Sequence, residues 1–393
     1  MLLNKKRVHV EWIFFPIIYM VLYKTKIGLI LMDRAAKKFP RLVGLFSFLA
    51  VIFGFAGMAA ILFLLINGTY AHLFNGAPPP VAPLFPGVKS APGVPVMSFF
   101  HWIIAIFILA TVHEFSHGLV SRLYNIRVKS SGFAIFGFFL PIIPAAFVEP
   151  DEYQLSKAKI KEQLGVLAAG SFSNLINALL SLLIFSFVLV PAFSSTIYSD
   201  GVLIVEVQEN YPANLSGVNS GEEILEINNL KINNVRDFLA SMDEVAPGDK
   251  IELVTNESSY LITTVNPPKT FFEKLKFWKK DTGYLGIFPI SLISEPKEGM
   301  ETISKILSWV SLLFFWIFAA NLGVGLFNLL PMGPLDGGKM FYLVALNVIK
   351  KENIAKKVWI GMGLFCIALI LISLLPFLAK LLTYLLGFFV GLF

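Results

Sequence analysis

Residues 98–121, SFFHWIIAIFILATVHEFSHGLVS, are the most informative part of the chain. This stretch is long and apolar enough to cross a bilayer as one helix, yet it contains His113-Glu114-Phe115-Ser116-His117. Residues four apart share one face of a helix, so His113 and His117 can bind a single zinc ion with Glu114 beside them. Because ionisable side chains at membrane depth are expensive, we expect this cluster to be functional.

The composition of the chain is typical of a membrane protein. Of its 393 residues 56% are hydrophobic and 15% are charged, whereas soluble domains have roughly 45–50% and 25%. The net charge is +6, and the basic residues concentrate in short connectors between apolar runs, as in cytoplasmic loops. We therefore expect no nucleic-acid partner. The single cysteine, Cys366, excludes a thiolate metal site, so the ligands must be His, Asp or Glu.

The apolar runs predict a polytopic α-helical membrane protein with about six transmembrane helices, the number being open between five and seven. Expected spans are 42–66, 98–121, 163–193, 302–331 and 358–375, and Pro376 separates the last from a further apolar piece, 377–393. Between them we expect one inserted small α/β domain. The predicted segments are an N-terminal interfacial or re-entrant segment (1–41), three helices with a re-entrant loop (42–193), the soluble domain (194–268), a juxtamembrane interfacial segment (269–300) and the C-terminal helices (301–393).

Two elements should complete the metal site. Catalytic zinc needs a third protein ligand and an open position for water, and Asp336 in NLLPMGPLDGG (328–338) is the best candidate. It follows an uncharged run, and the charge bias places it at the same membrane face as His113 and His117. Residues 130–150 are apolar but broken by glycines and prolines, which predicts a re-entrant loop or β-hairpin beside the metal.

These residues predict a hydrolytic mechanism. Zinc lowers the pKa of a bound water towards ~7 and polarises the scissile carbonyl, while Glu114 transfers the water proton to the leaving nitrogen. A substrate helix must first unwind, because its backbone is protected by its own hydrogen bonds. The irregular segment 130–150 offers an edge for an extended substrate.

The acidic stretch 198–266 predicts a soluble domain. Strand-like pieces at 201–207, 224–227, 250–255 and 260–265 alternate with turn residues, and 234–244 predicts a short helix. After it, KTFFEKLKFWKK (269–280) mixes Lys with Phe and Trp and should lie along lipid headgroups.

Together these residues closely resemble the site-2 protease family of intramembrane zinc metalloproteases. HEFSHG at 113–118 matches one family motif, 328–338 a second, and Gly170-Ser-Phe-Ser-Asn174 a third, with Ser171 in place of the usual proline. The resemblance implies that His113, His117 and Asp336 bind one Zn²⁺ per chain and that Glu114 is the acid/base. It puts Asn174 near the site, where its amide could stabilise the oxyanion or form an interhelical hydrogen bond. Asn328 is a candidate for shaping the turn that presents Asp336 and for substrate contact.

Residues 198–266 resemble a PDZ domain, which occurs between these helices in one branch of that family. The matching pieces are GVLIVEV from Gly201 and GVNSGEEILEINN from Gly217. The resemblance implies a peptide-binding loop at Gly201, Val202 and Leu203, although a purely steric filter is an alternative. GYLGI at 283–287 also resembles a segment that follows the domain in relatives.

Three functions compete on these observations. The first is regulated proteolysis, in or near a transmembrane segment, of a membrane-protein substrate. The second is zinc-dependent transport, for which we find no internal repeat. The third is a PDZ-type membrane scaffold with an inactive protease core. The presence of all three candidate zinc ligands and of Glu114 argues against this function. For the first, we expect a multi-pass protein embedded in the lipid bilayer, with the active site near the cytoplasmic face and the PDZ-like domain extracytoplasmic. The oligomeric state is left open.

Overall fold

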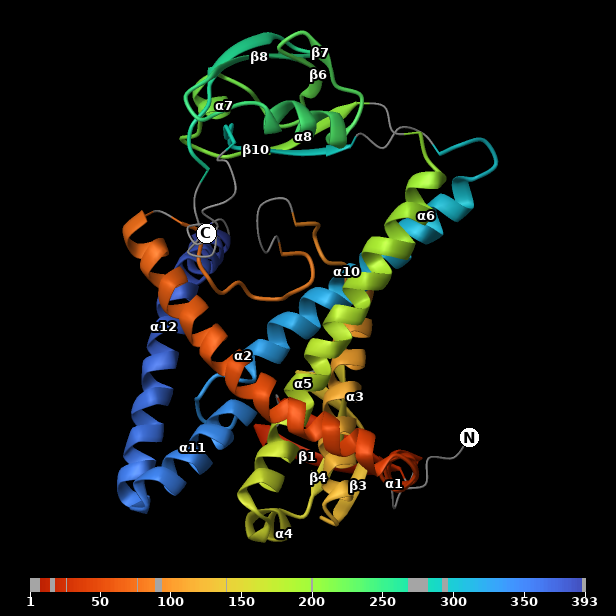
Figure 1. Ribbon diagram of the computed structural model, residues 1–393, viewed down its shortest axis with the longest axis vertical. Coiled ribbons are helices and arrows are strands. Elements are labelled where there is room, and N and C mark those ends of the chain that lie inside the picture. Colours follow the sequence, from red (N-terminus) through yellow and green to blue (C-terminus); the bar gives the residue numbers. More distant parts are fainter. Residues whose placement is uncertain are drawn as a thin grey trace. The chain divides into compact units, whose positions relative to one another are not determined.

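The computed structural model describes residues 8–14, 18–25, 27–75, 77–88, 94–138, 140–198, 201–267, 282–291 and 296–390. The chain divides into two compact units (Figure 1). The first comprises Met1–Val88, Met97–Phe185 and Leu312–Phe393 and is mainly helical. The second comprises Lys89–Val96 and Ser186–Ser311 and contains an antiparallel sheet.

Among the described residues, five helical segments are long and apolar enough to cross a membrane, so the protein is a multi-pass membrane protein. They are α2 (Pro40–Asn75), α3 (Phe99–Leu123), α5 (Ile160–Ile184) with its continuation through the π-helical turn Phe185–Leu189 into α6 (Val190–Ser195), α10 (Glu301–Phe327) and α12 (Glu352–Val390). Shorter helices are α1 (Ile27–Lys38), α4 (Glu152–Lys157) and α11 (Asp336–Ile349).

The expected break at Pro376 is wrong, because α12 continues through it. The two C-terminal apolar pieces therefore form one helix rather than two, and the described candidates number five, at the lower end of the expected range of five to seven. Proline is tolerated in membrane helices, where local adjustment and neighbouring groups satisfy the freed carbonyl.

A four-stranded antiparallel sheet lies in the helical unit. Its order is β1 (Val8–Phe14), β2 (Ile18–Thr25), β3 (Val128–Phe138), β4 (Leu140–Pro150), so β4 is an edge strand. The predicted hairpin over 130–150 is confirmed as β3–β4. The prediction for 1–41 missed that a second hairpin from this segment joins the same sheet. Pairing between these strands provides hydrogen-bond partners for backbone N–H and C=O groups that lie in the membrane unit outside its helices.

Helix α3 is held by contacts on several sides. It packs against α5, β4 and α1. Gly118 leaves room for Met32 of α1, because a Cβ there would lie 2.7 Å from the Met32 Cε. Near the end of α3, Arg122 Nε lies 3.1 Å from Asp33 Oδ1. These contacts fix the orientation of the helix that carries the HExxH motif.

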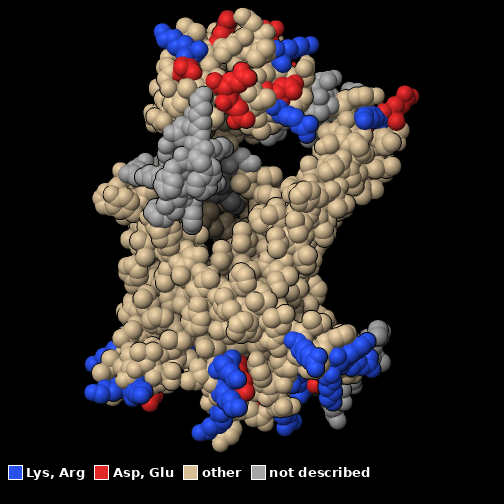
Figure 2. Space-filling model, in the orientation of Figure 1, with Lys and Arg blue, Asp and Glu red and all other residues tan. Residues whose placement is uncertain are grey.

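Figure 2 shows a broad uncharged surface on the helical unit, with Lys and Arg gathered at one end. This end carries α1, α4 and the turn between α11 and α12 (Figures 1 and 2). The exposed basic residues there include Lys37, Lys38, Arg41, Lys157, Lys161, Lys350, Lys351, Lys356 and Lys357. The uncharged surface is what lipid contact requires of a membrane protein.

The second unit is built on a sheet of order β10-β5-β6-β8-β9, with β7 paired to β6. Its elements are β5 (Val202–Val207), α7 (Pro212–Leu215), β6 (Glu223–Ile227), β7 (Leu230–Lys231), α8 (Val235–Asp243), β8 (Lys250–Thr255), β9 (Ser259–Thr263) and β10 (Ile287–Ser291). Its core consists mainly of aliphatic side chains from the strands together with Phe238 and Met242 of α8. The four predicted strands and the helix are confirmed within about two residues.

The predicted end of the soluble domain at residue 268 is wrong. Strand β10 pairs with β5 from Ile287↔Val207 to Ser291↔Val202, so the folded unit continues to Ser291. The expected juxtamembrane segment 269–300 therefore contributes a strand to the sheet. Its basic aromatic part, 269–280, lies outside the described residues.

Candidate metal centre

Helix α3 presents two histidines on one face. His113 and His117 are one turn apart, and their Nε2 atoms lie 3.1 Å from each other. The opposing residue on α5 is Gly170, where an added Cβ would lie 2.6 Å from both Cε1 and Nε2 of His113 and would also overlap Nε2 of His117. Glycine is therefore what allows α5 to approach the two rings this closely.

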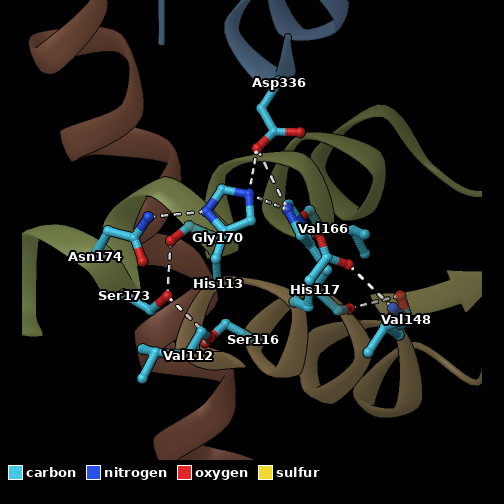
Figure 3. A network of polar contacts seen from close by, with 12 residues as sticks. Val112, His113, Ser116, His117, Val148, Val166, Gly170, Ser173, Asn174 and Asp336 are labelled. Carbon is cyan, nitrogen blue, oxygen red and sulfur yellow. Dashed lines mark hydrogen bonds and ion pairs between the residues drawn. The ribbon is translucent and has the colours of Figure 1, made fainter. Parts of the chain in front are cut away.

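Asp336 reaches the same point from the first turn of α11 (Figure 3). Its Oδ2 lies 3.2 Å from His113 Nε2 and 3.3 Å from His117 Nε2. A tight turn precedes it, closed by a hydrogen bond of 2.8 Å from Gly337 N to Asn328 O. A Cβ at Gly337 would overlap the carbonyl of Leu329, so the turn requires glycine there.

The chemistry of these atoms fits a bound cation. His117 Nδ1 lies 2.7 Å from the Val166 carbonyl and donates to it, which leaves a lone pair on His117 Nε2 facing the site. Asp336 Oδ2 is buried and has no hydrogen-bond donor among the described residues. Four ligands around zinc at 2.0–2.1 Å are roughly 3.3–3.4 Å apart. The separations of 3.1–3.3 Å between the three atoms match that spacing.

Glu114 is held beside this site by the sheet. Its Oε2 accepts a hydrogen bond of 3.1 Å from the backbone N–H of Val148 in β4. Glu114, Val148 and the three candidate ligands all line one cavity of about 600 Å³. Charged residues from other elements also line it, namely Lys129, Glu149, Glu152 and Lys339. A cavity lined in this way can hold water next to the metal ligands.

The remaining predicted site residues fall in different places. Asn174 is fully buried on α5, with its Nδ2 3.1 Å from His113 Nδ1. Asn328 lines the cavity and accepts the turn hydrogen bond described above. Val202 and Leu203 belong to the other unit and are paired on both sides, to β10 and to β6. Strand addition therefore has no free edge there.

Two site contacts come from the backbone and carry no signal in the sequence: the Val166 carbonyl and the Val148 N–H. The two cavity lysines, Lys129 and Lys339, were also missed as site residues. Both are single basic residues close to a motif, and in the sequence they are indistinguishable from the other lysines of basic loops.

The model of peptidase family M50 matches residues 101–371. The uncharacterized protein MJ0971 of Methanocaldococcus jannaschii is 31% identical over 80% of this chain and 74% of its own length. A protein of Clostridium perfringens named as a candidate zinc metalloprotease is 23% identical over 65% of this chain and 85% of its own length.

Among solved structures, the PDZ domain of an SdrC-like protein from Listeria innocua aligns with 21% sequence identity. The alignment covers 24% of this chain and 98% of that domain. The TM-score is 0.19, which carries no argument about the fold. The PDZ-like interpretation of the second unit stays a prediction.

Proposed function

Because the chain belongs to peptidase family M50, the site-2 protease family, we propose that it hydrolyses a peptide bond in or near a transmembrane segment of another membrane protein. The observation that carries this proposal is the convergence of His113, His117 and Asp336 beside Glu114 in one cavity of a helical membrane unit.

The roles of the residues follow from their contacts. When bound, zinc lowers the pKa of a coordinated water and polarises a carbonyl. His113, His117 and Asp336 would hold the ion through Nε2, Nε2 and Oδ2. Glu114 takes the proton of the attacking water and delivers it to the leaving amide nitrogen. The hydrogen bond from Val148 N–H keeps the Glu114 carboxylate at the cavity wall, where this transfer takes place.

Strand β4 is the proposed docking edge for the unwound substrate. It is an edge of the membrane sheet, and Val148 and Glu149 of β4 line the metal cavity. An extended segment that pairs with such an edge gains main-chain hydrogen bonds, which offset those lost when a substrate helix unwinds. This edge therefore supports cleavage of a substrate segment in an extended conformation, as the proposed intramembrane proteolysis requires.

The proposed sidedness is that the metal site opens towards the cytoplasm. His117 lies roughly 9 Å along the helix axis from Leu123, the end of α3, and Arg127 and Lys129 follow. Lys and Arg are enriched on the cytoplasmic side of membrane proteins. The sheet domain of the second unit, residues 201–291, would then be extracytoplasmic and act as a PDZ-like peptide binder or a size filter.

Replacing Glu114 with Gln tests the proposal. The Glu114→Gln protein should bind zinc and fold as the wild type does, but cleave a single-span reporter in detergent or membranes about 10²–10⁴-fold more slowly. Glu152→Gln is the matched control, because Glu152 lines the same cavity from α4, is exposed, and belongs to neither the candidate ligands nor the proposed docking strand. Retained cleavage by Glu114→Gln would remove Glu114 from its role. A folded wild type that binds zinc but does not cleave the reporter would contradict the hydrolytic proposal.

A further inference from the structure

The amide of Asn174 has an unusual environment. It is buried, with no exposed surface, and lies against the ring of His113 on the side opposite the metal-facing nitrogen (Figure 3). Its Nδ2 is 3.1 Å from His113 Nδ1, and its Oδ1 has no hydrogen-bond partner among the described residues. A buried carboxamide oxygen without a donor is costly, so this arrangement requires an explanation.

We infer that Asn174 is the positioning residue for the ligand His113 and accepts its Nδ1–H through Oδ1. The inference rests on the proposed zinc site. A histidine that binds metal through Nε2 carries its proton on Nδ1, so the atom facing Nδ1 must be an acceptor. A half-turn of the carboxamide exchanges its oxygen and nitrogen and brings Oδ1 to Nδ1. The same half-turn gives the buried oxygen a donor and places Nδ2 where the oxygen stood.

The other ligand has the equivalent arrangement on the same helix. His117 Nδ1 donates to the Val166 carbonyl at 2.7 Å. Val166, Gly170 and Asn174 follow one another at intervals of four residues and therefore form one stripe along α5. The stripe supplies an acceptor for each ring and, between the acceptors, the glycine gap that admits both rings.

Helix α10 fixes Asn174 from another side. A Cβ at Gly325 would lie 3.0 Å from the Cβ of Asn174, so the two helices are in close contact at this residue. Asn174 is not among the described residues that line the metal cavity. An amide held behind the imidazole in this way contacts the ligand ring rather than the cavity in which a substrate carbonyl would lie. This distinguishes it from an oxyanion-stabilising group.

Zinc affinity of the purified full-length protein tests this inference, with Zn²⁺ as the probe in competition with a chromogenic chelator. Asn174→Leu, which removes the acceptor, should weaken zinc binding about 10–100-fold. Asn174→Asp keeps an acceptor and should bind zinc as tightly as the wild type or more tightly, and should cleave the reporter when zinc-saturated. Ser173→Ala is the control, because Ser173 is the buried neighbour that bonds Val112 and Gly170 rather than a ligand ring.

Two results would overturn the inference. One is wild-type zinc affinity in Asn174→Leu, or in Asn174→Ala should the leucine variant not fold. The other is a zinc-saturated Asn174→Asp protein whose cleavage falls 100-fold or more, which would assign Asn174 to the oxyanion. A wild-type protein that binds no zinc would instead overturn the proposed function and this inference with it. If the wild type binds zinc and the Asn174→Leu protein binds it equally tightly, only the inference about Asn174 is contradicted and the proposed function stands.

Discussion

Gly170→Ala is the substitution whose effect the structure specifies most closely. The added Cβ would lie 2.6 Å from two atoms of the His113 ring, whereas ordinary contacts begin at 3.4 Å. The ring or the helix must therefore move by about 0.8 Å, a large displacement on the steep repulsive side of a van der Waals contact. Overlap with the His117 ring prevents relief by moving His113 alone. We therefore expect that Nε2 of His113 and Nε2 of His117 no longer face the same position and cannot bind one metal ion together.

The expected magnitude is a loss of at least ~100-fold in zinc affinity, or about 2.7 kcal/mol. Global stability should change less, because alanine gains about 1 kcal/mol over glycine in a helix and this offsets part of an overpacking cost of about 1–3 kcal/mol. Chelator competition on purified protein measures the affinity, and thermal melting of the metal-free protein measures the stability.

Gly323→Ala is the matched control, since a Cβ at this helical glycine meets nothing within 4 Å. It should leave zinc binding and cleavage unchanged. A Gly170→Ala protein with wild-type zinc affinity and wild-type cleavage would refute the reasoning, because α5 would then not be in contact with the two rings.

Two further substitutions have defined outcomes. In Gly337→Ala the new Cβ meets the Leu329 backbone, including its Cα at 2.7 Å, so the turn before Asp336 should open, with a loss of roughly 1–3 kcal/mol and of bound zinc, read by melting and metal analysis. In the second unit, burial would raise the pKa of Glu222, but hydrogen bonds, among them those from Thr255 and Tyr260, hold it below its usual value. Its stabilisation is therefore present above the unfolded-state pKa of about 4.3 and is lost as pH falls through the lower folded-state pKa. Glu222→Gln should lower the free energy of unfolding by roughly 1.5–3 kcal/mol at pH 7. Hydrogen exchange of β8 should show this difference between the wild type and the variant disappear in acid. A difference that does not depend on pH would contradict the prediction.

The sequence predicts well those parts of the site that depend on local spacing. The i, i+4 histidines fall on one helical face whatever surrounds them, so His113 and His117 converge as expected. Asp336 is predictable because a lone carboxylate after a long uncharged run needs a partner at membrane depth. The alternation of 201–265 likewise predicts strands, since β5, β6, β8 and β9 each bury one face on a single core.

What the sequence could not predict depends on contacts between distant segments. Strand β10 is separated from β5 by about 80 residues and pairs with it through backbone groups that every residue carries. The hairpin β1–β2 joins β3 in the same way, across the whole of α1, α2 and α3. Val166 and Val148 contribute through a carbonyl and an N–H, so their identity as valines gives no signal. The expected break at Pro376 follows from rules for water-exposed helices, which do not hold in a bilayer.

The central claim is that three side chains from α3 and α11 hold one metal ion. Zinc content per chain of the purified wild type, measured beside Asp336→Ala of equal melting behaviour, tests it most directly. We expect one zinc per wild-type chain and a loss of tightly bound zinc in Asp336→Ala. A folded wild type without zinc, or an Asp336→Ala protein that keeps a full equivalent, would contradict it.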